Sequence, residues 1–249
     1  MRTTQQQEKV TLTLSEEEIK QLNQQFETKT AEEVLRWALD RFHPQITLAC
    51  SFGLEDVTLI DMLTKLHKAP RVFCLDTGRL HQETYDVMDQ IRSKYGIQIE
   101  VYFPNQAAVE KMVRAKGVNL FYHSVENRHE CCAVRKVEPL ERALSGMKAW
   151  ITGLRKTQSV TRANTARVEI DSPHGRIAKL NPLIDWTEQE VWDYIKKNQV
   201  PYNRLHDQGY PSIGCAPCTR AIKSGEDIRA GRWWWENPES KECGLHRVN

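Results

Sequence analysis

The stretch ITLACSFG (residues 46–53) contains a unit that recurs along this chain. A short, mostly apolar run is followed by a Ser-Phe-Gly turn, and apolar side chains then recur at helical spacing from Val57 to Leu63. This order predicts a buried strand, a tight turn and a helix. A strand followed so closely by a helix is typical of parallel βαβ units.

The same unit appears again farther along. RVFCL (residues 71–75) leads into Asp76-Thr77-Gly78, and a helix is expected from about Leu80 to Tyr95. Further strands are expected at residues 97–103, 149–153 and 177–183. The alternation predicts an α/β fold with a single doubly wound, mostly parallel sheet. Ligands bind at the carboxyl ends of such strands, so we expect a site where the polar turns meet.

The sequence divides into three parts. Residues 1–25 are rich in Gln and Glu and predict an N-terminal arm or a short helix. Residues 26–218 are expected to form the α/β domain. Residues 219–249 are expected to form an irregular, mobile C-terminal tail, because regular periodicity is lost after about Pro201.

The composition is that of an ordinary water-soluble protein. Of 249 residues, 35 are basic and 33 acidic, and the net charge of +2 gives no general basis for binding nucleic acid or membranes. The N-terminus lacks an apolar signal segment, and no apolar run is long enough to span a membrane. These features predict a cytoplasmic protein whose thiols stay reduced.

Four of the seven cysteines form two tight groups, the pair Cys131-Cys132 and the CxxC made by Cys215 and Cys218. Grouped thiolates bind zinc or an iron–sulfur cluster. Adjacent side chains diverge, which favours the corners of a bulky [4Fe–4S] cluster over one zinc ion. Zinc stays open, as does a structural role for the adjacent pair. Lys136 lies four residues after Cys132, so one helical face would bring its ammonium group near the cluster and the pocket.

The other three cysteines stand apart from these groups. Cys50 and Cys74 lie inside apolar strands and are predicted to be core thiols. Cys243 lies in the polar tail near His246, which is close enough in sequence to tune the thiol. We predict that Cys243 is a nucleophile, with an incidental surface thiol as the alternative.

Two turns have anion-binding character. Ser51, Phe52 and Gly53 precede a helix whose free backbone N–H groups suit a monophosphate or sulfate group, although a structural turn explains them equally well. The loop of residues 153–162 supplies basic groups and neutral donors, namely Arg155, Lys156, Gln158, Ser159 and Arg162. Arginine binds phosphate or sulfate through two parallel hydrogen bonds. The alternative for this loop is a solvated basic surface.

A second basic run, residues 227–235, contains Arg229, Arg232 and three consecutive tryptophans. These arginines would lower the pKa of Cys243 once the tail closes over a pocket. The alternative is that the tryptophans merely pack the tail.

Several of these motifs together resemble the assimilatory adenylyl-sulfate (APS) reductases, which belong with the phosphoadenylyl-sulfate (PAPS) reductases. The resemblance is carried by the Cys131-Cys132 pair, the CAPC motif (residues 215–218), the loop of residues 153–162 and the ECGLH tail (residues 242–246). LHDQGYPSIG (residues 205–214) strengthens the likeness, which runs from about Leu35 to His246.

The resemblance implies an adenine-nucleotide α-hydrolase-like domain with a [4Fe–4S] cluster and a nucleophilic Cys243. The implied cluster ligands are Cys131, Cys132, Cys215 and Cys218. The implied substrate-binding residues form a modified phosphate loop, a nucleotide pocket and a basic pocket: Ser51, Phe52, Gly53, Leu75, Asp76, Thr77, Gly78, Lys136, Gly153, Arg155, Arg162, Arg229 and Arg232.

The implied reaction reduces APS to sulfite and AMP through a sulfonate on Cys243. Electrons would come from a separate thioredoxin or a glutaredoxin-like protein, because the chain stops soon after Cys243 without a fused thioredoxin-like domain. We expect the cluster to act electrostatically through Lys136 rather than by changing oxidation state.

Several alternatives stay open. A PAPS-preferring or dual APS/PAPS reductase would share these motifs, and the sequence leaves a homo-oligomer open. An ATP-dependent tRNA-thiolating iron–sulfur enzyme is more distant, because residues 51–56 depart from a Ser-Gly-Gly phosphate loop and the net charge is near zero. A zinc-bound interaction module is the non-enzymatic alternative.

Overall fold

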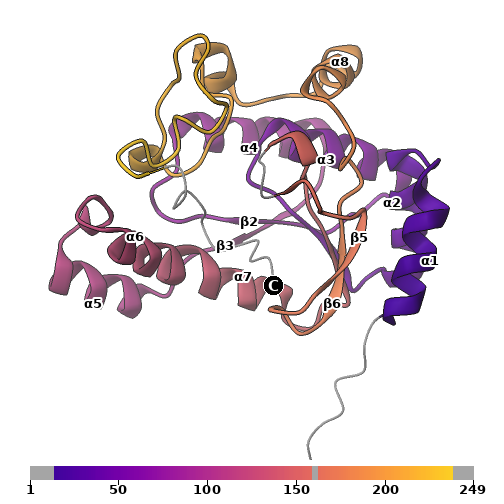
Figure 1. Ribbon diagram of the computed structural model, residues 1–249, viewed down its shortest axis with the longest axis horizontal. Helices are drawn as coiled ribbons and strands as arrows, with labels where there is room; N and C mark the ends of the chain where they lie inside the picture. The colour runs from indigo at the N-terminus through magenta and orange to yellow at the C-terminus, as the bar shows by residue number, and fades with distance from the viewer. Residues whose placement is uncertain (1–13, 159–161, 238–249) are drawn as a thin grey trace, which may run out of the picture.

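The computed structural model describes residues 14–158 and 162–237, which are built around one six-stranded sheet (Figure 1). The strand order is β3-β2-β1-β4-β6-β5. Every neighbouring pair is parallel except β5 and β6, which are antiparallel. The strands are β1 (Ile46–Ala49), β2 (Val72–Leu75), β3 (Ile99–Tyr102), β4 (Ala149–Ile151), β5 (Val168–Asp171) and β6 (Ile177–Leu180). The predicted mostly parallel α/β sheet is confirmed.

The helices connect and cover these strands. They are α1 (Glu16–Phe26), α2 (Ala31–Phe42), α3 (Leu54–Leu66), α4 (Gln82–Tyr95), α5 (Gln106–Lys116), α6 (Val125–Cys132), α7 (Glu138–Leu144) and α8 (Glu188–Asn198). Three of them begin with capping boxes, in which a Ser or Thr and a Glu three residues later satisfy each other's backbone N–H groups. These pairs are Ser15 with Glu18, Thr30 with Glu33 and Thr187 with Glu190.

Alternate strand residues face opposite sides of the sheet and so contribute to two cores. Phe73 and Trp150 pack in a smaller cluster with Leu140 of α7. Val72 and Ile151, their neighbours in sequence, instead join the larger core. Figure 1 shows α3 and α4 on one side of the sheet and α7 on the other. Strands β1, β2 and β4 are therefore buried on both faces, as their apolar runs predict.

The sequence did not predict β5. This edge strand has no continuous apolar run, and its alternation of apolar and acidic residues, VEID, extends over only four residues, of which Val168 and Asp171 are buried. Its edge is covered by α1: the Asn23 side-chain amide donates to the Val168 carbonyl (2.9 Å) and its oxygen accepts from the Val168 N–H (3.0 Å). The short-helix alternative for the N-terminal arm is thus confirmed over Glu16–Phe26.

The C-terminal part of the described chain packs without a long helix. It includes 3₁₀ turns at Arg204–Gln208 and Ala216–Cys218 and a β-bridge between Thr219 and Arg232. Trp233 is only 1% exposed. Packed structure therefore continues at least to residue 237, whereas the sequence places the start of the tail at residue 219. Residues 238–249 lie outside the described residues.

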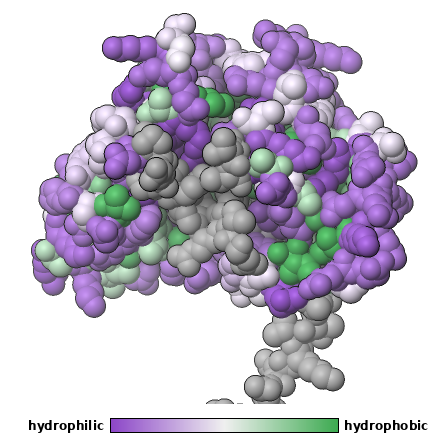
Figure 2. Space-filling model, viewed as in Figure 1, coloured by the Kyte–Doolittle hydropathy of each residue, from purple (hydrophilic) through white to green (hydrophobic). Residues whose placement is uncertain are grey.

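One face of the described chain can be seen in space-filling form (Figure 2). Most residues on the face seen in Figure 2 are hydrophilic. Within residues 14–158 and 162–237, no helix combines the length and the apolar character that a membrane span requires.

Candidate active site

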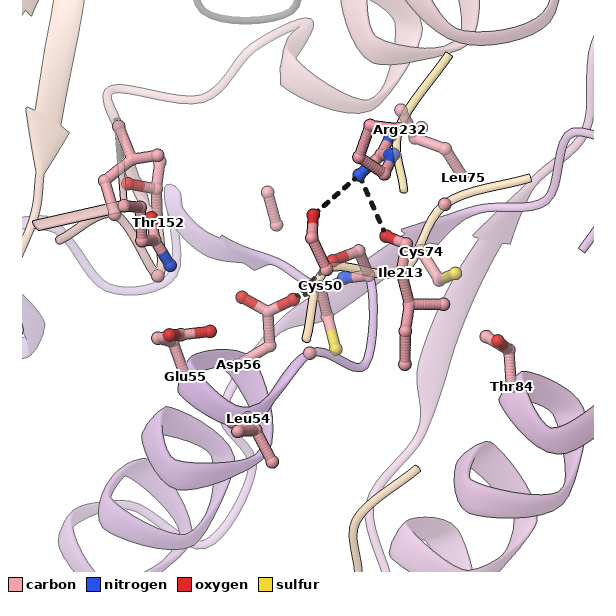
Figure 3. A pocket seen from close by; sticks show the side chains of 18 of the residues that line it. Cys50, Leu54, Glu55, Asp56, Cys74, Leu75, Thr84, Thr152, Ile213 and Arg232 are labelled. Atoms are coloured by element: carbon pink, nitrogen blue, oxygen red, sulfur yellow. Dashed lines mark hydrogen bonds between the residues drawn. The ribbon is translucent and has the colours of Figure 1, made fainter. Parts of the chain in front are cut away.

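A cavity of about 260 Å³ lies at the carboxyl ends of β1, β2 and β4 (Figure 3). The turns after these strands contribute Ser51, Thr77 and Gly153 to its lining. In the sheet, β2 and β3 follow β1 on one side, and β4 is added on its other side. The order in which the strands are added therefore reverses at β1. Such a switch point is where doubly wound sheets bind ligands, as the sequence predicts.

The turn after β1 is held in shape by Asp56. The Ser51 backbone N–H and hydroxyl both donate to Asp56 Oδ2, at 2.7 and 2.8 Å. Burial nevertheless dominates at this carboxyl and raises its pKa to about 6. Gly53 precedes the first residue of α3 and lines the cavity. Phe52 is 1% exposed and lies outside the lining.

The turn after β2 uses its predicted residues in two ways. Leu75 and Thr77 line the cavity. Asp76 lies outside the lining; it is buried and accepts from the Gly78 N–H (2.8 Å) and the Tyr85 hydroxyl (3.0 Å). Asp76 and Gly78 therefore shape the turn, whereas Leu75 and Thr77 face the cavity.

Arg155 reaches the cavity from the turn after β4, but it is already paired. Its Nε donates to Glu55 Oε1 at 2.7 Å, and its Nη1 donates to the Thr157 hydroxyl at 2.8 Å. The Arg155 side chain is 3% exposed and that of Glu55 13%. This pair makes Arg155 a rigid rather than a mobile cation. Arg162 also lines the cavity and donates to Gln158.

Three further cations reach the cavity from other elements. Lys136 comes from a π-helical turn, Ala133–Val137, between α6 and α7. Arg229 and Arg232 come from the C-terminal segment. Arg232 Nη1 donates to the Ser212 hydroxyl (3.1 Å) and the Ile213 carbonyl (3.2 Å), as Figure 3 shows in part. All five basic residues predicted for this pocket thus line one cavity, which suits an anionic ligand.

Two features of the cavity were missed by sequence reasoning. Glu55 and Asp56 place carboxyl groups among the cations (Figure 3). His206 also lines the cavity, and burial lowers its pKa. Acidic residues are common in the first turn of any helix, so the sequence held no specific signal for Glu55 and Asp56. The histidine had no signal of its own beyond the 205–214 segment.

A second, smaller cavity of about 20 Å³ is lined by all four grouped cysteines, Cys131, Cys132, Cys215 and Cys218. Burial raises the pKa of Cys131, and it raises that of Cys218 to about 12 with a further contribution from the Cys215 thiol. Lys136 and Trp233 line both cavities, so the two spaces adjoin. The predicted juxtaposition of the thiols, Lys136 and the pocket is therefore observed.

The chemistry of this smaller cavity suits a sulfur-rich group. Four thiols surround one space, although in the described part of the chain no three His, Cys, Asp or Glu side chains are grouped as ligands of a single metal ion. Trp233 also lines the space, and Trp235, Cys131 and Cys218 all pack against a small apolar cluster that includes Phe121. The Trp233 indole N–H is buried without an acceptor among the described residues, so it is a donor available to a sulfur atom in this space.

The remaining predicted residues can be placed briefly. Cys50 and Cys74 are 4% and 2% exposed, which confirms them as core thiols, and both reach the floor of the larger cavity. Burial raises the pKa of Cys74 to about 12, so it stays a thiol. Cys243 and His246 lie outside the described residues.

Comparison with known proteins identifies relatives of this chain. Residues 45–221 match the phosphoadenosine phosphosulfate reductase domain. An adenosine 5'-phosphosulfate reductase of Allochromatium vinosum is 55% identical over 202 residues, which cover 81% of this chain and 78% of the relative. The chloroplastic 5'-adenylylsulfate reductase 3 of Arabidopsis thaliana is 44% identical over 241 residues, which cover 94% of this chain and 52% of that protein.

A solved structure shares the fold. The phosphoadenylyl-sulfate (PAPS) reductase of Candida auris, in its phosphate complex, superimposes with a TM-score of 0.72 at 32% identity. The match covers 84% of this chain and 98% of that chain.

Proposed function

This chain belongs to the phosphoadenosine phosphosulfate reductase family, and we propose that it reduces APS to sulfite and AMP in assimilatory sulfate reduction. The observation that carries the proposal is the convergence of five basic side chains on one cavity beside four thiols. Identity of 55% to an adenosine 5'-phosphosulfate reductase, against 32% to a PAPS reductase, favours APS over PAPS.

The cavity would bind the anionic end of APS through charge and backbone donors. Gly53 lies at the N-terminus of α3, where free N–H groups attract phosphate or sulfate oxygens. Lys136 reaches the same space from the π-helical turn, and Arg229 and Arg232 reach it from the C-terminal segment. Fixed donors and cations of this kind stabilise negative charge that grows on the leaving phosphate.

Cys243 would supply the nucleophile. Its thiolate attacks the sulfur of APS, an S–S bond forms, the S–O bond to the phosphate breaks, and AMP leaves. A thiolate of thioredoxin, or of a glutaredoxin-like protein, then attacks Cys243 Sγ and releases sulfite. The second thiol of that reductant resolves the mixed disulfide and completes a two-electron reduction. This thiol chemistry suits a reducing compartment such as the cytoplasm.

We propose that Cys131, Cys132, Cys215 and Cys218 hold a [4Fe–4S] cluster. The support is that two sequence groups place all four thiols around one space that adjoins the cationic cavity. The bound cluster would add charge beside Lys136 and tie together the segments that carry its ligands. The protein's own residues hold the substrate and perform the sulfur transfer.

Steady-state kinetics with thioredoxin tests this proposal. We expect sulfite and AMP from APS in equal amounts, a higher kcat/KM for APS than for PAPS, and no turnover by Cys243→Ser. A clearly higher kcat/KM for PAPS would mean that PAPS, and not APS, is the preferred substrate. If Cys243→Ser still turned over, the assignment of Cys243 as the nucleophile would be wrong.

A further inference from the structure

A buried ion pair joins α6, the helix that ends with Cys131 and Cys132, to the end of the described chain. Arg128 in α6 is fully buried, and the Glu236 side chain is 3% exposed. Arg128 Nε donates to Glu236 Oε1 at 2.8 Å, and Nη2 donates to Oε2 at 2.9 Å. Two parallel hydrogen bonds fix the direction of both side chains as well as their distance.

The same arginine lies against Trp233, which connects it to the larger cavity. The guanidinium carbon of Arg128 is 4.6 Å from the centroid of the Trp233 ring, and that of Arg232 is 4.8 Å from it. Arg128 lines the cysteine cavity, Arg232 lines the larger cavity, and Trp233 lines both. A contiguous stack therefore runs from one cavity to the other.

Glycine at position 214 allows this stack to form. A Cβ atom there would lie 2.5 Å from Arg232 Nη2 and 2.8 Å from its guanidinium carbon. The Arg232 guanidinium is thus held between the backbone at Gly214 and the Trp233 ring. Its position depends on where Trp233 is held, and Trp233 in turn lies against Arg128.

Stability alone does not explain a fully buried ion pair. The cost of removing two charges from water cancels much of their attraction, and well-packed apolar side chains are often as stabilising. The pair instead gives a unique position to the chain that it anchors. Cys243 follows Glu236 by only seven residues in the sequence, so the pair anchors the chain shortly before the proposed nucleophile.

We propose that Arg128 and Glu236 are positioning residues for the sulfur-transfer reaction. The pair holds Trp233, and through it Arg232, in register with the larger cavity, and it fixes the point from which the chain continues toward Cys243. This inference rests on the proposed function, because the role of Arg232 is to bind the anionic substrate.

Two variants separate positioning from folding. Glu236→Gln keeps the shape of the side chain but removes the negative charge that pairs with the buried Arg128. Arg128→Met/Glu236→Leu removes both charges and keeps apolar volume, so it should fold even where the single variant does not. Glu226→Gln is the matched control, because Glu226 pairs with Arg220 in the same segment at a more exposed position, with side chains 31% and 37% exposed.

The readouts are the Kd for AMP by calorimetry and the single-turnover rate of sulfonate formation on Cys243 at saturating APS. We expect both pair variants to bind AMP at least tenfold more weakly and to form the sulfonate at least tenfold more slowly, with the Glu226→Gln control unchanged. The Tm of the double variant should stay within a few degrees of the unmodified protein.

A folded double variant with unaltered AMP affinity and sulfonation rate would overturn the inference and leave the pair a merely structural contact. Failure of the proposed function is a different result: the unmodified protein would then form no sulfonate on Cys243. AMP binding needs no Cys243 chemistry, so it still reports on the pair in that case. An unmodified protein that binds no AMP would remove both proposals.

Discussion

Gly153 is the point at which the turn after β4 approaches the first turn of α3. A Cβ atom there would lie 2.6 Å from Asp56 Oδ1 and 2.7 Å from Glu55 Cβ. Gly153→Ala should therefore displace both carboxyl groups and lower the free energy of unfolding by about 1–3 kcal/mol, the usual cost of overpacking. Urea unfolding measures the change.

Gly53→Ala is the matched control for that prediction. Gly53 has a φ of −69°, which any residue adopts, and a Cβ atom there would meet its neighbours at 3.6 Å or more. A loss of stability for Gly53→Ala as large as for Gly153→Ala would contradict the steric explanation.

Asp56 should make the stability depend on pH. Burial raises its pKa from 3.8 to about 6. Between these values the folded state binds a proton that the unfolded state has released, so the free energy of unfolding falls as the pH rises from about 4 to 6. The full effect is about 3 kcal/mol. Asp56→Asn should lose this part of the pH dependence, measured by urea unfolding at pH 4.5 and pH 7. Asp89→Asn, at an exposed position, should keep it.

At the scale of residues, side-chain chemistry predicted the cations and thiols but not the carboxyl groups. Thiols and guanidinium groups have few roles, so their grouping in the sequence points to sulfur or anion chemistry. Glu55 and Asp56 resemble ordinary residues of a first helical turn. Only the folded turns show that Glu55 pairs with Arg155 and that Asp56 holds Ser51.

Among the elements, the α6–α7 segment departs most from sequence expectation. Helical spacing predicted Lys136 on the face of Cys132, four residues earlier. The structure instead has a π-helical turn at Ala133–Val137 between the two helices. Such turns often occur at functional sites, and spacing alone does not reveal them. The turn lets Lys136 line both cavities.

Lys136→Gln tests this placement. A hydrogen bond to a charged partner contributes about 1.5–3 kcal/mol, so the variant should bind AMP roughly tenfold to a hundredfold more weakly. Lys156→Gln is the control from the predicted basic loop, because Lys156 pairs with Asp185 and lies outside the lining of the cavity. Equal losses in the two variants would mean that only the overall charge matters.

The predicted strands lie in segments of at least five residues that are mostly apolar or alternate, whereas the missed strand β5 has only four residues. β1, β2 and β4 are buried on both faces, and their sequences show it. β5 forms because it pairs with β6 and because Asn23 covers its edge. The Asn23 contact comes from a part of the chain 145 residues away, which a local pattern does not contain.

For the whole molecule, the decisive feature is that two cavities with different chemistry adjoin. Their common lining includes Lys136, Cys215 and Trp233. Sequence patterns predicted a ligand site at the carboxyl ends of the strands and, separately, a metal site at the four grouped cysteines. Their adjacency was expected from the spacing of Cys132 and Lys136 and from the resemblance to APS reductases, but the shared lining by Cys215 and Trp233 depends on packing between remote segments.

Cys131→Ser should remove the proposed cluster. We expect this variant to lose the visible absorbance, the protein-bound iron and sulfide, and the activity together. Cys74→Ala is the control, since Cys74 is a core thiol that lines only the larger cavity. Full iron and sulfide content in Cys131→Ser would contradict its assignment as a ligand, and stoichiometric zinc in a colourless protein would replace the cluster.

The central claim is that sulfur moves from APS to one thiol of this chain. Intact-mass analysis after incubation with APS, followed by peptide mapping, measures that step directly. The account predicts one sulfonate per chain, located on Cys243, which thioredoxin releases as sulfite and which Cys243→Ser does not form. A protein that binds APS yet gains no sulfonate, or gains it on another cysteine, would contradict the account.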